Sequence, residues 1–305
     1  MNDLYFRVAD ADFHLVYKNQ DDVRQLLPSY APFHLPAGST ESCLFTMTVD
    51  DGLVPHQQQG KEIGHFDSGD AIHTVCLLDD GGYLILINDH TDRPTCALRT
   101  SSDFSINTAT LSGSDDERAY GLNNALMIAY AFSGAHHHRL LMHASVPMKD
   151  GYAYLFLGKS GTGKSTHSRL WLQHIPGTDL LNDDNPVVRY DETDHSVSVY
   201  GTPWSGKTPC YRNLRMKAGG FLRLQQYPEN ILRKLSKVEA FATILSSCST
   251  MIWDKPSYDG ICDTVSQIAG LTPAYHLQCL PDQAAAELSY SHLGRTAAPA
   301  SLLQP

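Results

Sequence analysis

The chain of 305 residues lacks the features that mark small secreted, membrane-spanning or zinc-binding proteins. Its seven cysteines are scattered, odd in number and never spaced C-x-x-C. This argues against a disulfide framework or a zinc site and favours reduced thiols. The longest apolar run, residues 125–132, is too short to span a bilayer, and no apolar segment follows a basic start as in a signal peptide. We therefore expect a cytoplasmic protein.

Positive charge is also scarce. Lysine and arginine number 23 against 33 aspartate and glutamate residues, which gives a formal net charge of −10. This balance argues against nucleic acid or an anionic membrane as the main partner. Any anionic substrate must then be held by a local cluster of cations. The length allows one large or two moderate domains, and a homo-oligomer remains open.

One stretch carries a recognisable chemical pattern. The apolar run 154–157 ends directly on Gly158-x-x-x-x-Gly163-Lys164-Ser165, the phosphate-binding P-loop (Walker A) pattern. Residues 166–174 can continue as a helix, so strand, loop and helix N-terminus follow in the order that phosphate binding requires. The alternative is a flexible Gly/Ser loop without a ligand.

The residue types in this loop suit a nucleotide. Glycine backbones approach a ligand closely, and the N–H groups at the helix N-terminus point toward it. Lys164 supplies charge for the β- and γ-phosphates, and the Ser165 hydroxyl is a natural Mg²⁺ ligand, with Mn²⁺ as a substitute. The predicted ATP-binding residues are Gly158, Ser160, Gly161, Thr162, Gly163, Lys164, Ser165 and Thr166.

An acidic pair, Asp183 and Asp184, follows Lys164 by 19 and 20 residues, after the apolar pair Leu180-Leu181. Two carboxylates at the end of a strand can divide metal binding and proton abstraction between them. The alternative is a solvated turn. Beside a P-loop we favour the chemical interpretation, so the predicted metal ligands are Ser165, Asp183 and Asp184.

The remaining pattern predicts an α/β fold of the α+β kind. Residues 1–115 should form a β-rich domain with an antiparallel sheet, including a hairpin around the turn 79–82. Residues 116–293 should form a second domain, and 294–305 a flexible tail. A helix over 118–133, ended by Gly134, should join the two halves.

Further elements are expected within the second domain. Strands are predicted over 140–146, 187–190, 196–200, 220–224 and 275–280, and helices from the capping box 236–239 and from 281–292. The loop 201–208 carries Lys207, and Arg212 follows it. Both cations are candidates for stabilising a transferred phosphoryl group, or else surface charges on a turn.

Several histidines could have either a functional or a structural role. His143 lies on the predicted strand 140–146 beside the loop, where an active-site role and a packing role are equally supported. His56, His65 and His73 match no metal-ligand spacing. Residues 136–138 are three adjacent histidines, which cannot all face one site, so we interpret them as structural or exposed.

Residues 143–184 resemble two related nucleotide-binding families. His143-Ala144-Ser145, the loop 158–166 and Asn182-Asp183-Asp184 together look like ATP-dependent phosphoenolpyruvate carboxykinase and like the catalytic domain of HPr kinase/phosphorylase. The resemblance implies a mixed, largely antiparallel sheet with flanking helices. It also implies that His143 lies near the metal or the transferred phosphate, and that the two aspartates serve as Mg²⁺ ligand and catalytic base.

The resemblance has limits that affect the substrate. The chain is much shorter than a carboxykinase, and the arginine-glycine signature of the kinase is replaced by residues 201–207. We therefore expect an ATP- and Mg²⁺-dependent phosphotransferase of the HPr-kinase-like type, acting on a hydroxyl of a protein, peptide or small molecule. Its predicted catalytic residues are Asp183, Asp184, His143, Lys164, Lys207 and Arg212. The alternatives are a carboxykinase-like lyase, a nucleotide-binding regulator without transfer activity, and a plain binding module.

Overall fold

The computed structural model describes residues 2–18, 23–36, 42–52, 60–67, 71–206 and 208–295. Its contacts divide the chain into two compact units, Met1–Gly134 and Ala135–Pro305. The composition placed a boundary near residue 115, whereas this division keeps the helix α1 (Asp115–Ala135) almost wholly with the first unit. The predicted tail from residue 296 onward lies outside the described residues. Among the described residues, no helix combines the length and the apolar composition that a membrane span requires.

The first unit contains a mixed sheet, which has nine strands in the described part of the chain. The strand order is β3-β1-β2-β4-β9-β8-β7-β6-β5. The elements are β1 (Asn2–Val8), β2 (Ala11–Tyr17), η1 (Val23–Leu26), η2 (Pro28–Phe33), β3 (His34–Leu35), β4 (Phe45–Val49), β5 (Lys61–Asp67), β6 (Ile72–Leu77), β7 (Tyr83–Asn88), β8 (Pro94–Thr100) and β9 (Ile106–Leu111).

The expected antiparallel sheet is partly wrong for this unit. The hairpin at residues 79–82 is confirmed, because β6 and β7 pair antiparallel with Leu77 opposite Tyr83. However, β4 pairs parallel with both β2 and β9. Parallel neighbours need a crossover connection, and the chain between β2 and β4 is long enough to supply one. Hairpin signals are local, so they could not reveal these pairings.

The helix α1 packs into the core of the first unit. Tyr130 donates a hydrogen bond from Oη to the carbonyl oxygen of Val8 at 2.8 Å, and the rings of Phe132 and Phe104 lie 5.2 Å apart. The helix continues through Gly134 to Ala135, so Gly134 does not end it as expected. The buried apolar positions of its last turns favour helix continuation over a glycine stop.

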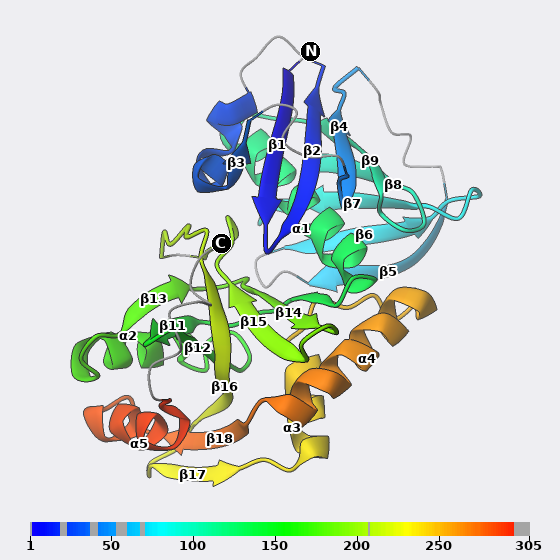
Figure 1. The fold of residues 1–305 in the computed structure, drawn as a ribbon. Coiled ribbons are helices and arrows are strands. Elements are labelled where there is room, and N and C mark those ends of the chain that lie inside the picture. Colours follow the sequence, from blue (N-terminus) through cyan, green and yellow to red (C-terminus); the bar gives the residue numbers. More distant parts are fainter. Residues whose placement is uncertain are drawn as a thin grey trace. The chain divides into compact units, whose positions relative to one another are not determined.

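The second unit also contains a mixed sheet, ordered β10-β14-β15-β16-β12-β11-β13, with β18 beside β16 and β17 beside β18 (Figure 1). Its elements are β10 (Arg139–Leu141), β11 (Val146–Lys149), β12 (Tyr152–Leu157), α2 (Lys164–His174), β13 (Asp179–Asn182), β14 (Val187–Asp191), β15 (Ser196–Tyr200), β16 (Arg215–Gln226), β17 (Ile231–Lys234), α3 (Lys237–Leu245), α4 (Lys255–Leu271), β18 (Ala274–Cys279) and α5 (Gln283–Leu293).

The pairings of this sheet match the expected mixed, largely antiparallel pattern. β12 and β18 run parallel to β16, and the other pairs of the described strands are antiparallel. The register between β12 and β16 shifts after Ala153, which leaves Gly219 as an extra residue. A Cβ at Gly219 would lie 2.4 Å from the ring of Tyr154, so only glycine fits at this bulge.

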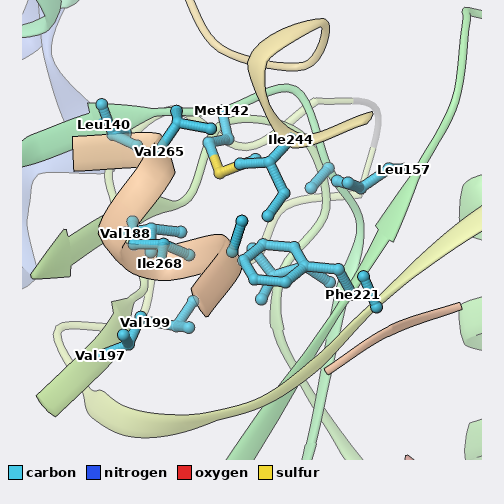
Figure 2. Packing of buried hydrophobic residues seen from close by; sticks show 14 of the residues in the cluster. Leu140, Met142, Leu157, Val188, Val197, Val199, Phe221, Ile244, Val265 and Ile268 are labelled. Atoms are coloured by element: carbon cyan, nitrogen blue, oxygen red, sulfur yellow. The ribbon is translucent and has the colours of Figure 1, made fainter. Parts of the chain in front are cut away.

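Alternation along β12 gives the sheet two apolar faces. Ala153, Leu155 and Leu157 face a core shared with Ile244 of α3 and with Val265 and Ile268 of α4 (Figure 2). Tyr154 and Phe156 face a second core with Trp171 of α2 and Leu293 of α5. Both faces of the central strand are therefore buried, which fixes the position of the loop that leaves its end.

Candidate active site

The loop between β12 and α2, residues 158–163, is built around glycines and is called the glycine loop below. Gly158 has φ +149°, and a Cβ there would lie 2.6 Å from Oγ1 of Thr162. Gly163 has φ +101° and is the N-cap of α2, which begins without a side-chain cap. The first N–H groups of an uncapped helix favour an anionic ligand.

The side chain of Lys164 lies across this loop. Its Nζ donates to the carbonyl oxygens of Gly158 at 2.9 Å and Lys159 at 3.3 Å, and to Nε2 of His143 at 2.9 Å. Burial lowers the pKa of Lys164, and the carboxylates of Asp184 and Asp183 act in the opposite direction. The lysine is thus held close to both predicted carboxylates.

A chain of hydrogen bonds joins Lys164 to Asp184 through His143. The lysine ammonium has donors only, so Nε2 of His143 accepts and Nδ1 carries the hydrogen. Nδ1 then donates to Oδ1 of Asp184 at 2.9 Å. The His143 side chain is 46% exposed and that of Asp184 31%, so a ligand can reach both.

The sequence predicted one continuous strand around His143, and the structure does not show it. The expected strand 140–146 is divided into β10 and β11. Between them, Met142 forms an isolated bridge with Cys248 and Ser145 forms one with Phe156. The backbone N–H of His143 donates to the carbonyl oxygen of Ser247 at 2.7 Å. Successive residues of this segment pair with different parts of the chain, and the His143 side chain is thereby directed toward the glycine loop.

Asp183 has a different environment from Asp184. It is buried, and its Oδ1 accepts from Oγ of Ser145 at 2.5 Å while its Oδ2 accepts from Oγ1 of Thr208 at 2.6 Å. Because Ser145 donates its single hydroxyl hydrogen to Asp183, the hydroxyl of Ser168 in α2 donates to Ser145 at 2.6 Å. Sequence reasoning missed Ser168 and Thr208.

Asp184 is oriented by its immediate neighbours. Its backbone N–H donates to Oδ1 of Asn182 at 2.9 Å, and its Oδ2 accepts from Nδ2 of Asn185 at 2.9 Å. The backbone carbonyl oxygen of Asp184 accepts from the N–H of Ala144 at 2.8 Å, which ties the acidic pair to the histidine segment. The two carboxylates therefore differ in access, with Asp184 the more exposed.

Comparison with protein-family models and with curated proteins gives no match for this chain. The geometry of the site therefore carries the functional argument.

The other predicted residues lie in different places. Ser160 and Ser165 are exposed on the glycine loop and the first turn of α2, and Oγ1 of Thr166 accepts from Arg169 at 3.3 Å. Arg212 forms two bonds, of 2.5 and 2.9 Å, with Asp179.

Asp179 opens β13, whose opposite end leads to Asp183, so the structure does not bring Arg212 to the glycine loop. Arg212 instead neutralises the carboxylate of Asp179. The position of Arg212 after the loop 201–208 could not predict this pairing. Lys207 lies outside the described residues.

The histidine groups occupy separate positions. His136 contacts Ser257, while His138 contacts Thr264 and lies 3.3 Å from Glu192. His73 is buried and accepts from the N–H of Asn88, and His56 lies outside the described residues. Among the residues that the structure describes, no group of three or more His, Cys, Asp or Glu side chains is arranged to hold a metal ion.

Proposed function

We propose that this protein is an ATP- and Mg²⁺-dependent phosphotransferase that moves a phosphoryl group to a hydroxyl of a protein, peptide or small molecule. The observation that carries the proposal is the continuous chain Lys164–His143–Asp184 across the glycine loop, with Asp183 beside it. A lysine, a histidine and two carboxylates at an uncapped helix N-terminus combine anion binding with proton transfer.

The residues present fit a magnesium nucleotide. The glycine loop leaves open space at Gly161 and Gly163, where an added Cβ meets nothing within 4 Å, so a phosphate chain can approach the backbone. Mg²⁺ is usually held by one or two carboxylates together with phosphate oxygens, so it needs no cage of protein ligands. Bound MgATP would supply the transferable phosphoryl group and neutralise its charge.

The chain's own residues then divide the work. Lys164 neutralises phosphate charge, and the N–H groups of the glycine loop and of α2 orient it. Asp183 is buried, whereas the Asp184 side chain is 31% exposed, which leaves Asp184 as the carboxylate that an acceptor hydroxyl can reach. We assign proton acceptance to Asp184, oriented by His143, and metal binding to Asp183 with Ser165.

The test is label transfer from γ-labelled ATP to components of a lysate or metabolite extract, with and without Mg²⁺. We expect Mg²⁺-dependent transfer by the wild type and none by Lys164→Ala, with unchanged circular dichroism. Lys159→Ala is the matched control, because Lys159 is an exposed lysine of the same loop. It should transfer label normally.

Other outcomes would point to the alternatives. Tight ATP binding without transfer or hydrolysis would indicate a regulator. Nucleotide-dependent loss of oxaloacetate would indicate a carboxykinase-like lyase. Equal activity of Lys164→Ala and the wild type would contradict any nucleotide-based function of this loop.

A further inference from the structure

One face of the second unit's sheet changes from apolar to basic at the level of the glycine loop. Phe221 of β16 and Ala274 of β18 are paired and buried in the core that faces α3 and α4. Two residues further along the same face, Arg223 pairs with His276, and His276 pairs with Arg233 of β17. We call these three residues the basic row.

The basic row begins beside the glycine loop. Arg223 is paired with Leu157, the last residue of β12, so it lies one strand away from the start of the loop. Adjacent strands are about 4.8 Å apart, so the row extends roughly 5–15 Å from the end of β12. Nε2 of Gln226 donates to the carbonyl oxygen of Gly161 at 3.0 Å, which fixes the end of β16 against the loop.

The row has hydrogen-bonding capacity that the described part of the chain does not use. The side chain of Arg223 is exposed and forms no hydrogen bond or ion pair with another described residue. Nε2 of His276 is buried without a partner among these residues. Arg233 contacts Glu239 of α3 at 2.8 Å, so one of the two guanidinium charges is neutralised. In a chain with a net charge of −10, this local positive charge would favour an anion.

The pKa of His276 should rise when such an anion binds. Burial lowers the pKa of His276, Arg223 and Arg233 lower it further, and Glu239 raises it. An anion bound between the arginines would offset their effect, so His276 would take up a proton on binding. Proton uptake is therefore a second signature of occupancy.

We propose that the basic row binds a phosphate or carboxylate group of the phosphoryl acceptor, so that the acceptor is an anionic hydroxyl compound. This inference rests on the proposed phosphotransferase function. Asp183 and Asp184 would repel such an acceptor, and the charge of Arg223, with that of His276 once it is protonated, would offset that repulsion. The planar guanidinium of Arg223 matches the two oxygens of either group.

The experiment is calorimetric titration of the whole chain, saturated with Mg²⁺ and the non-hydrolysable analogue AMP-PNP, with inorganic phosphate and, separately, with malonate. Arg223→Gln should weaken binding of the preferred anion about tenfold or more, as expected for a lost charge-assisted hydrogen bond. The control Lys255→Gln removes an equal charge from α4, where Lys255 pairs with Asp259, and should change nothing. AMP-PNP affinity should be the same in all three proteins.

Two buffers of different ionisation enthalpy should reveal more proton uptake by the wild type than by His276→Gln, because the added anions titrate alike in both proteins. Loss of AMP-PNP affinity in Arg223→Gln would mean that the row holds the nucleotide's own phosphates, and unchanged anion binding would mean a plain surface charge. Either result overturns the proposal.

If the wild type fails to bind AMP-PNP, the phosphotransferase proposal fails. Phosphate binding without nucleotide that Arg223→Gln abolishes and Lys164→Ala keeps would then still support an anion site at the row.

Discussion

In their described residues, the two units of this protein contain sheets of the same size and similar pairing. They differ in how a strand connects to the helix that follows it. Both sheets are mixed, and in both a central strand has parallel neighbours, β4 in the first unit and β16 in the second. In the second unit, β12 leads through the glycine loop into α2. In the first unit, β9 leads into α1, whose first turn is capped by Ser114, whereas α2 begins at Gly163 without a side-chain cap. The units therefore differ at the start of the helix and not in the sheet.

The buried acids of the two units differ in the same way. In the first unit, the buried Asp89 accepts from Thr91 and Arg93, so it serves its own turn. In the second unit, Asp183 joins Ser145 and Thr208 from distant segments. Asp183 therefore joins three segments of the second unit, whereas Asp89 bonds only its neighbours in sequence.

The acids provide the largest expected difference between the units. Asp184→Asn and Asp183→Asn should each lower phosphoryl transfer by about 10²–10⁴-fold, because a general base or a metal ligand is lost. Asp89→Asn, a buried acid of the first unit, should leave transfer nearly unchanged. Initial rates at saturating MgATP measure this. Near-normal turnover in both second-unit variants would remove their assigned roles.

Core truncations should separate stability from binding. Leu15 and Leu155 are fully buried in β2 and β12, and Leu→Ala at either position should lower the free energy of unfolding by about 2–5 kcal/mol. Leu155→Ala should also weaken AMP-PNP binding, because β12 positions the glycine loop. Urea unfolding and calorimetry measure the two effects. Weaker nucleotide binding in Leu15→Ala would contradict the separation of the units.

A buried histidine should make the second unit sensitive to acid. Burial lowers the pKa of His167 to about 4, and its Nε2 contacts Oγ of Ser289 at 3.0 Å. The unfolded chain then binds more protons between pH 6.5 and 4, so stability decreases as the pH is lowered through this window. The expected loss between pH 7 and 5 is about 2 kcal/mol. Urea unfolding of His167→Gln should lack this component, and an equal loss in the variant would assign it to another group.

The smallest effects concern helix caps, which both units use alike. Ser114 and Glu117 begin α1, and Ser236 and Glu239 begin α3, each pair bonding reciprocally as a capping box. Ser→Ala at either position should lower the free energy of unfolding by about 1 kcal/mol. Thermal unfolding measures it, and a change of nucleotide affinity in Ser114→Ala would conflict with a purely local role.

Local patterns allowed the sequence to predict part of the site. The glycine loop, the start of α2 and the acidic pair are contiguous motifs, and the structure brings His143, Lys164 and Asp184 together. The capping box at Ser236 is confirmed for the same reason. These features depend on neighbouring residues and on the order of strand, loop and helix.

Other features depended on long-range register. Thr208 reaches Asp183 across 25 residues, and Arg223 meets His276 across two paired strands, so neither contact has a sequence signature. The helix α4 was missed although Asp254 caps it and apolar residues recur on one face at Ile261, Val265 and Ile268. The signal for α4 was therefore present in the sequence.

The bulge at Gly219 has a consequence for which side of the protein can carry charge. Before it, the even-numbered residues of β16 face α3 and α4, and after it the odd-numbered ones do, as Ala218 and Phe221 show. Were the strand straightened with every residue kept, Arg223 would turn toward Tyr154 and Trp171, and Leu222 would turn away from them. Gly219, which packs against the ring of Tyr154, thus determines which face of β16 is apolar and which face carries charge.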